Sequence, residues 1–110
     1  MSKFLVIYHA PAEAMAAMAN ATPEEKEAGM KPWFAWKESI GAKLLDFGAP
    51  LMPGLQLLPD GSTKASTKEV TGYSMIEAAD MDEAKSLLSG HPHLQWTGGC
   101  DIEVHESVQM

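Results

Sequence analysis

The stretch that most constrains the fold lies near the N-terminus, where residues 3–9 read KFLVIYH. The run is rich in β-branched and aromatic residues and too short for a core helix, so it predicts a strand. Successive side chains of a strand lie on opposite faces of the sheet. The two faces here carry Phe4, Val6 and Tyr8 on one side and Leu5, Ile7 and His9 on the other. Because both faces are mainly apolar, we expect a central strand that is covered on both sides.

A long helical region follows. Thr22, with Glu25 three residues later, is the pattern of a capping box. Pro32 lacks a backbone donor and clashes with the preceding turn, so we expect helical pieces at 22–30 and 32–47, kinked or broken between them. Steps of three and four residues keep five apolar side chains of the second piece on one stripe. They are Trp33, Trp36, Ile40, Leu44 and Phe47.

The other elements follow from alternation, caps and turn residues. In chain order they are a short helix at 11–20, a strand at 51–58, a polar hairpin loop at 59–68, a strand at 69–77, a helix capped by Asp80, and a strand at 100–108. Pro53 cannot donate to a ladder, so the strand at 51–58 is expected at an edge or a bulge. The expected buried face of the last helix is Met81, Ala84, Leu87 and Leu88.

The order is β-α-β-β-α-β with an extra short helix after the first strand. It predicts an α+β domain of ferredoxin-like, split β-α-β type, with one four-stranded antiparallel sheet. Both main helices would lie on one face, and the apolar first strand leaves the other face in need of a cover. A second copy related by a two-fold axis is the simplest cover, so we expect a homodimer.

Bulk properties narrow the class of protein. A chain of 110 residues is expected to be one domain, 1–110. Its net charge of −7, with no arginine, disfavours nucleic acid and anionic membranes as partners. The apolar run at the N-terminus is too short for a signal peptide or a membrane span. Cys100 is the only cysteine, so no internal disulfide can form and we expect a cytoplasmic protein.

Several short stretches, in order along nearly the whole chain, resemble the YCII-related family, which includes the DGPF-type proteins. They are FLVIY, GAPLMPG, the Pro-Asp-Gly hairpin, VTGYSMIEA, GHPHL and CDIEV. The resemblance implies a dimeric α+β barrel with a small-molecule pocket and an acid/base pair of His and Asp. This chain departs from that pair at both positions, because Trp36 or Lys37 stands at the first and His91 at the second. Any chemistry here would therefore use other residues.

The candidate proton carriers are His9 and His93, since imidazole titrates near neutral pH. The groups that would orient them are the carboxylates Asp101 and Glu103. A flat, mostly apolar ligand would need aromatic walls, and the candidates for these are Trp33, Trp36, Met52, Tyr73 and Trp96. The alternative is that these apolar side chains are core and that His9 only packs beneath the short helix. His93 and Trp96 are expected at the mouth of a pocket.

A metal site is a weaker hypothesis. His91-x-His93 and Glu103-x-His105 offer ligands that suit zinc, iron or manganese. The alternative, which we favour, is a helix end and a solvated strand, so we expect no metal. Gly98-Gly99 is not followed by a helix and predicts no phosphate loop, and we expect no organic cofactor.

Two functions of different classes remain. One is a small enzyme that performs acid/base chemistry, of isomerase or lyase type, on a small aromatic metabolite. The other is a non-catalytic dimer that binds a ligand or presents an interaction surface. A His9 that faces a closed cavity and bonds a carboxylate would favour the enzyme, and a His9 filled in by side chains would favour the second function.

Overall fold

The computed structural model, which describes residues 1–96 and 98–110, places the apolar N-terminal segment at the centre of a sheet. β1 (Ser2–His9) pairs antiparallel with β5 (Val70–Ala78) on one side and with β6 (Asp101–Glu106) on the other. β2 (Leu44–Pro50) pairs with β5 and completes the order β2-β5-β1-β6. This sheet, with its helices on one face, confirms the predicted α+β, ferredoxin-like arrangement.

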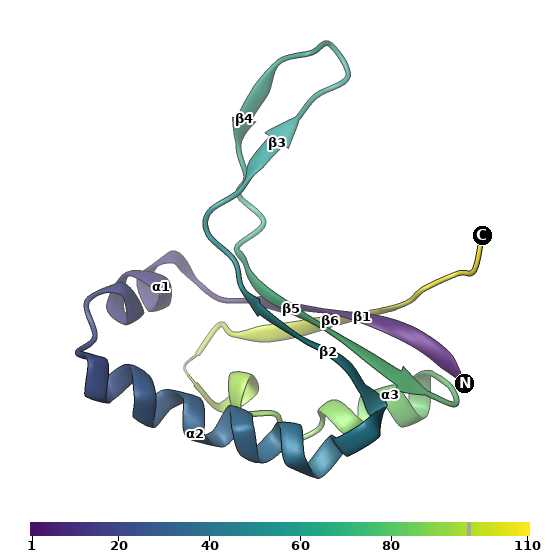
Figure 1. The fold of residues 1–110 in the computed structure, drawn as a ribbon. Helices are drawn as coiled ribbons and strands as arrows, with labels where there is room; N and C mark the ends of the chain where they lie inside the picture. The colour runs from purple at the N-terminus through teal and green to yellow at the C-terminus, as the bar shows by residue number, and fades with distance from the viewer. Residues whose placement is uncertain (97) are drawn as a thin grey trace.

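The helices form the second layer (Figure 1). They are α1 (Ala12–Ala19), α2 (Pro23–Ile40) and α3 (Met81–Leu88), with short 3₁₀ turns η1 (Gly41–Lys43) and η2 (Pro92–Gln95). The capping box predicted at Thr22 is present, since its hydroxyl accepts from the Glu25 N–H while the Glu25 carboxylate accepts from the Thr22 N–H. Within the described residues, no helix has the length and apolar character that crossing a bilayer requires.

The prediction of two helical pieces ending near residue 47 is wrong. α2 continues unbroken through Pro32 and ends at Ile40, where Gly41 adopts a positive φ of 62°. That conformation favours glycine, which has no Cβ. Leu44 and Phe47, expected on the helix stripe, belong to β2. Steps of three and four fit a helix, but side chains in that stretch can also reach the core from a strand. Pairing with β5 decides between the two.

The edge strand beside β5 is therefore β2, and the prediction of a sheet strand at 51–58 is also wrong. That segment holds only β3 (Leu55–Leu57), which pairs with β4 (Thr63–Ala65) in a separate ribbon. The ribbon projects from the sheet on the side away from the helices (Figure 1). β2 is irregular, because its register against β5 shifts twice. At Gly48 the φ angle is positive and a Cβ would collide with the Tyr73 carbonyl oxygen, so only glycine fits.

The core lies between the sheet and the helices. Phe4, Val6 and Tyr8 of β1 are buried there, as alternation predicts. Ala84 and Leu88 of α3 pack against them, with Leu87 partly buried. Met81 is 44% exposed, so its predicted place on the buried face of α3 is wrong. Met81 is the first residue of α3, and its side chain lies beyond the part of the helix that packs on the sheet.

The opposite side of the sheet is uncovered in the single chain, and we call it the open face. Leu5 and Ile7 of β1 lie there opposite Met75 and Tyr73 of β5. All four side chains are only half-buried. The helix-covered face and the open face thus carry separate sets of functional groups.

Candidate functional site

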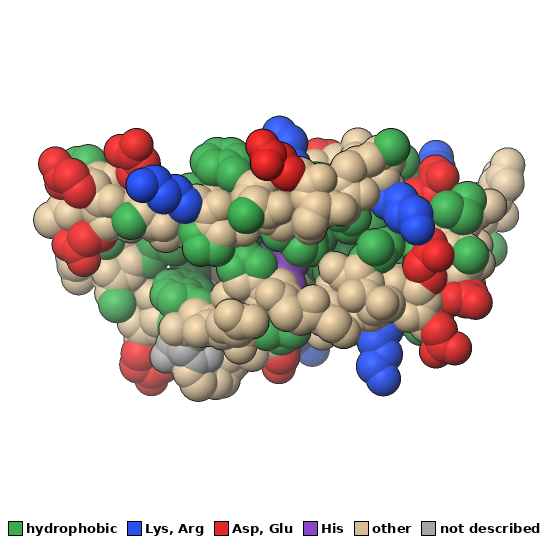
Figure 2. Space-filling view, turned by 90° about the horizontal axis from the view of Figure 1, so that it is seen from below, with side chains coloured by type: hydrophobic (Ala, Val, Ile, Leu, Met, Phe, Trp, Pro, Cys, Tyr) green, Lys and Arg blue, Asp and Glu red, His purple; other side chains and the backbone are tan. Residues whose placement is uncertain are grey.

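A pocket of about 420 Å³ lies between α1, α2, η2 and the helix-covered face of the sheet. Its aromatic walls are Tyr8, Trp33, Phe47 and Trp96. Three methionines of the two helices, Met15, Met18 and Met30, complete the lining on the helix side. Seen from the helix side, hydrophobic side chains surround a hollow in which histidine atoms are visible (Figure 2). Among the described residues that line the pocket, none carries an acidic or a lysine side chain.

Two histidines of the segment after α3 lie beside this pocket and are almost fully buried. His91 is 0% exposed and His93 is 2% exposed. His91 closes the start of η2, where its Nδ1 accepts a hydrogen bond from the His93 N–H at 3.0 Å. Its ring packs against Trp33 and Trp36, with centroids 4.6 and 4.4 Å away. The segment GHPH thus starts η2, and its two histidine side chains are buried.

A directed chain of hydrogen bonds begins at His91. Ser74 donates its only hydroxyl proton to the Phe47 carbonyl at 2.7 Å, so its oxygen can only accept from Tyr8, 2.8 Å away. Because the Tyr8 hydroxyl donates its proton to Ser74, the Tyr8 oxygen accepts from Nε2–H of His91 at 3.3 Å. The order His91 to Tyr8 to Ser74 to Phe47 fixes His91 as the neutral tautomer that is protonated at Nε2.

The two titratable members of the chain are both held in their neutral forms. Burial, together with the nearby His93, lowers the pKa of His91 from 6.5 to about 4. Burial also raises the pKa of Tyr8 from 10.0 to about 12, although its hydrogen bond to Ser74 acts in the opposite direction. Neither group changes charge near neutral pH, so the chain is a structural support and His91 and Tyr8 carry no proton to a ligand.

His93 differs from His91 because it faces the pocket. Its Nε2 lies 2.7 Å from the backbone carbonyl oxygen of His9. Its ring stands among three aromatic rings, those of Tyr8, Trp33 and Trp96, at centroid distances of 5.2, 6.2 and 6.1 Å. The carbonyl therefore orients an imidazole at the wall of an aromatic pocket.

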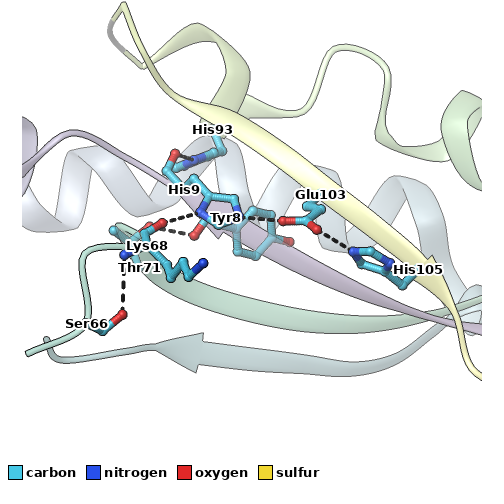
Figure 3. Close-up of polar contacts among 8 residues, drawn as sticks. All are labelled: Tyr8, His9, Ser66, Lys68, Thr71, His93, Glu103 and His105. Atoms are coloured by element: carbon cyan, nitrogen blue, oxygen red, sulfur yellow. Dashed lines mark hydrogen bonds and ion pairs between the residues drawn. The ribbon is translucent and has the colours of Figure 1, made fainter. Parts of the chain in front are cut away.

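The other candidate proton carrier, His9, lies on the open face (Figure 3). Its Nδ1 is 2.8 Å from the Lys68 carbonyl oxygen and its Nε2 is 2.9 Å from Oε1 of Glu103. A carbonyl and a carboxylate only accept, so both nitrogens donate and His9 is an imidazolium in this arrangement. Glu103 also accepts from Nε2 of His105, and we call these three residues the His9–Glu103–His105 row.

The pKa values of the row agree with that geometry. Burial alone would lower the pKa of His9, but hydrogen bonds to Glu103 and to the Lys68 carbonyl, with the nearby charge of Asp101, raise it above 6.5. The hydrogen bonds from His105 and His9 lower the pKa of Glu103 below 4.5. His9 and Glu103 therefore form a charged pair on the surface, whereas His91 beneath the sheet is held neutral.

The structure divides the predicted catalytic residues between the two faces. His93 lines the pocket, whereas His9, Asp101 and Glu103 lie on the open face, where Asp101 pairs with His9 and Glu103 with Ile7 across the strands. The groups weighed as metal ligands are divided in the same way. His91 and His93 lie under the sheet, and Glu103 and His105 lie above it.

The predicted pocket walls are divided as well. Trp33, Trp96 and Tyr73 are among the lining residues, although Tyr73 lies opposite Ile7 and its ring is directed to the open face. Trp36 lies in the core, where its indole N–H donates to the Leu87 carbonyl. Met52 is 85% exposed and lies outside the pocket, on the connection to the β3–β4 ribbon.

Sequence reasoning missed the chain of Tyr8, Ser74 and His91. One signal was available, since Ser74 is the polar residue at an inward position of a strand whose other inward residues are Gly72, Ile76 and Ala78. A buried hydroxyl in such a strand requires a partner. Ser74 is bonded to Tyr8, and Tyr8 in turn to His91 in the loop after α3. The alternation of residues along a strand does not predict the position of that loop.

No protein-family model matches the chain, and no curated protein matches its sequence. Among solved structures, it is similar to the 5-chloro-2-hydroxyhydroquinone dehydrochlorinase TftG from Burkholderia phenoliruptrix AC1100, solved as a complex with 2,5-dihydroxybenzoquinone. The two chains are 19% identical, with 92% of this chain and 90% of the other covered and a TM-score of 0.48. At this identity and TM-score, the similarity assigns neither a family nor a function to this chain.

Proposed function

We propose that this protein binds a small, flat and largely apolar molecule in the pocket between α1, α2, η2 and the sheet. The observation that carries the proposal is His93, a deeply buried imidazole that lines an otherwise aromatic and methionine-rich pocket. Small-molecule sites are typically about 300–1,000 Å³, mostly apolar, with a few placed polar groups. The pocket's volume of about 420 Å³ falls at the lower end of that range and suits a ligand of one or two rings.

Acid/base catalysis is a second candidate function, and His93 is the observation that favours it. Tyr8 and His91 keep their neutral forms, so among the described side chains here His93 is the candidate proton carrier. The carboxylates expected to orient it lie on the open face, and the His9 carbonyl takes their place. Binding is thus the better supported function, and an isomerase- or lyase-type reaction would have to proceed with His93 and no carboxylate partner.

We also infer that the chain is a homodimer of YCII-related type, with the open face as its interface. Leu5, Ile7 and Met75 are half-buried in the single chain, and a second copy would cover them. The position of the family's acid/base pair supplies further support. Trp36, one of the two candidates for the first position, and His91 at the second have ring centroids 4.4 Å apart.

Methyl NMR tests the pocket, because the methionines divide into pocket and surface groups. Met15, Met18 and Met30 line the pocket, with Met18 at its exposed edge, whereas Met52 and Met81 lie outside the pocket. Protein labelled with ¹³C at the methionine methyls would be titrated with phenol, indole and naphthalene. We expect the three pocket methyls to shift in a saturable manner and the two surface methyls to stay in place.

Two outcomes would contradict the proposal. One is that no compound shifts any pocket methyl at concentrations up to its solubility. The other is that pocket and surface methyls shift alike, as they would from weak contacts all over the surface. For the catalytic candidate, His93→Gln is the variant to compare with the wild type once a converted compound has been found.

A further inference from the structure

The hydrogen-bond pattern at His93 defines what its ligand must offer. The His9 carbonyl can only accept, so Nε2 of His93 donates to it, and in the tautomer that carries its one proton at Nε2 the other nitrogen, Nδ1, has a lone pair. Among the described residues, Nδ1 has no partner, and no buried side-chain nitrogen or oxygen is sealed off without one. Nδ1 is therefore not sealed off, and the hollow that His93 lines is the pocket. It is an acceptor inside a residue that is 2% exposed.

Two hydroxyl donors beside the pocket, those of Tyr8 and Thr71, are already used within the protein. Tyr8 gives its proton to Ser74, and Thr71 gives its own to the Tyr8 carbonyl at 3.2 Å. These groups cannot satisfy Nδ1 of His93 by turning toward it, because each would leave a buried acceptor behind. A ligand that donates a hydrogen bond can supply the donor that Nδ1 lacks, and a ligand that only accepts leaves Nδ1 unpaired.

Charge further restricts the ligand. The described lining residues include no acidic or lysine side chain that would compensate a charged ligand, and many of them are aromatic rings or methionines. Moving an ion from water into such surroundings without a partner is costly. An uncharged molecule meets no such cost. A neutral hydroxyl is the simplest group that donates to Nδ1 without bringing a charge.

We propose that the pocket selects uncharged, planar molecules whose hydroxyl donates a hydrogen bond to Nδ1 of His93, with phenols as the simplest members. Trp33 and Trp96 lie at similar centroid distances from the His93 ring, 6.2 and 6.1 Å. A flat ring bonded to Nδ1 would lie near these indoles, and aromatic rings attract one another at such distances. The inference rests on the proposed binding function and adds the chemical class of its ligand.

Four probes of similar size separate the requirements: phenol, anisole, benzoate and benzylammonium. Anisole replaces the hydroxyl by a methyl ether, and the last two carry a negative and a positive charge. Dissociation constants would be taken from the methyl shifts of Met15, Met18 and Met30. We expect phenol to bind about tenfold tighter than anisole, the size of one hydrogen bond to a buried acceptor, and the two ions to bind more weakly than phenol.

Variants assign the preference to His93. His93→Gln keeps an N–H donor for the His9 carbonyl and removes Nδ1, so the phenol preference over anisole should fall below about threefold. His105→Gln makes the same replacement at an exposed histidine outside the pocket and should leave the preference unchanged. If the His93 variant does not fold, the comparison of the four probes on the wild type still decides the ligand class.

The outcomes distinguish this inference from the proposed function. Equal affinities for phenol and anisole would overturn the hydroxyl requirement and leave a pocket that binds flat molecules. Tightest binding of benzoate or benzylammonium would overturn the requirement for an uncharged ligand. A retained phenol preference in His93→Gln would remove His93 as its cause. Failure of all four probes to shift the pocket methyls would overturn the proposed function itself.

Discussion

The neutral form of His91 makes a sharp prediction about stability and pH. A proton added to this side chain would go to Nδ1, which already accepts the His93 N–H at 3.0 Å, and it would place a charge in a residue that is 0% exposed. The folded protein therefore resists protonation of His91 down to about pH 4, whereas the unfolded chain takes up the proton near 6.5. Between these values the unfolded state binds more protons, so stability falls as the pH falls.

The magnitude follows from the two pKa values. A change from 6.5 to about 4 corresponds to about 3 kcal/mol at about 1.4 kcal/mol for each pH unit. The stabilisation is fully present above pH 6.5 and is lost as the pH falls toward 4. About 2 kcal/mol of it should be gone at pH 5. The lowered pKa of Glu103 and the raised pKa of His9 also affect stability in this range, so the contribution of His91 is taken from a variant that changes His91 alone.

The assay is urea unfolding at pH 7 and pH 5, at one protein concentration, for the wild type and His91→Asn. Asparagine can still accept the His93 N–H at this cap position and does not titrate. The variant is less stable at pH 7, and its deficit should shrink by about 2 kcal/mol at pH 5. His105→Asn, at an exposed histidine, should keep the wild-type pH dependence. Equal losses in the wild type and His91→Asn would refute the reasoning, because His91 would then be protonated near 6.5 in the folded state.

Two further predictions concern the open face. Met75→Lys should dissociate the proposed dimer, whereas Met52→Lys, on an exposed residue outside the sheet, should not, and sedimentation velocity would report either mass. An unchanged dimer in Met75→Lys would place the interface elsewhere. His9→Gln should destabilise the protein more at pH 6 than at pH 9 in urea unfolding, because a raised pKa contributes stability below 6.5 that is lost as the pH rises through the folded value. A deficit that grows toward pH 9 would contradict the imidazolium assignment.

Local patterns predicted much of the fold because their physical causes are local. Alternation in β1 placed Tyr8 and His9 on opposite faces, and the caps at Thr22 and Asp80 started two helices where expected. The stretch from Ile40 to Pro50 was misread because its apolar spacing fits a helix and a strand equally well. Pairing with β5, which is distant in the sequence, makes residues 44–50 a strand. No residue near this stretch predicts that pairing.

In the candidate site, too, the residue types could be predicted from the sequence, but their arrangement in space could not. Aromatic and imidazole content indicated Trp33, His93 and Trp96, and the structure brings all three to one pocket. The sequence placed His9 correctly on the side of Leu5 and Ile7 but gave no means to decide which face of the sheet would hold the pocket. That depends on where α1 and α2 pack, which is a property of the whole chain.

His9 takes part in hydrogen bonds on both faces of the sheet, through its backbone on one and through its side chain on the other. Its backbone carbonyl orients His93 under the sheet, and its side chain joins Glu103 above it. A side-chain substitution at His9 therefore leaves the acceptor for His93 in place. Protonation raises charge on the open face and costs stability at His91, so pH acts with opposite sign on the two faces. Near neutral pH, His91 and Tyr8 behind the pocket keep one charge state, whereas the charge of His9 on the open face depends on pH.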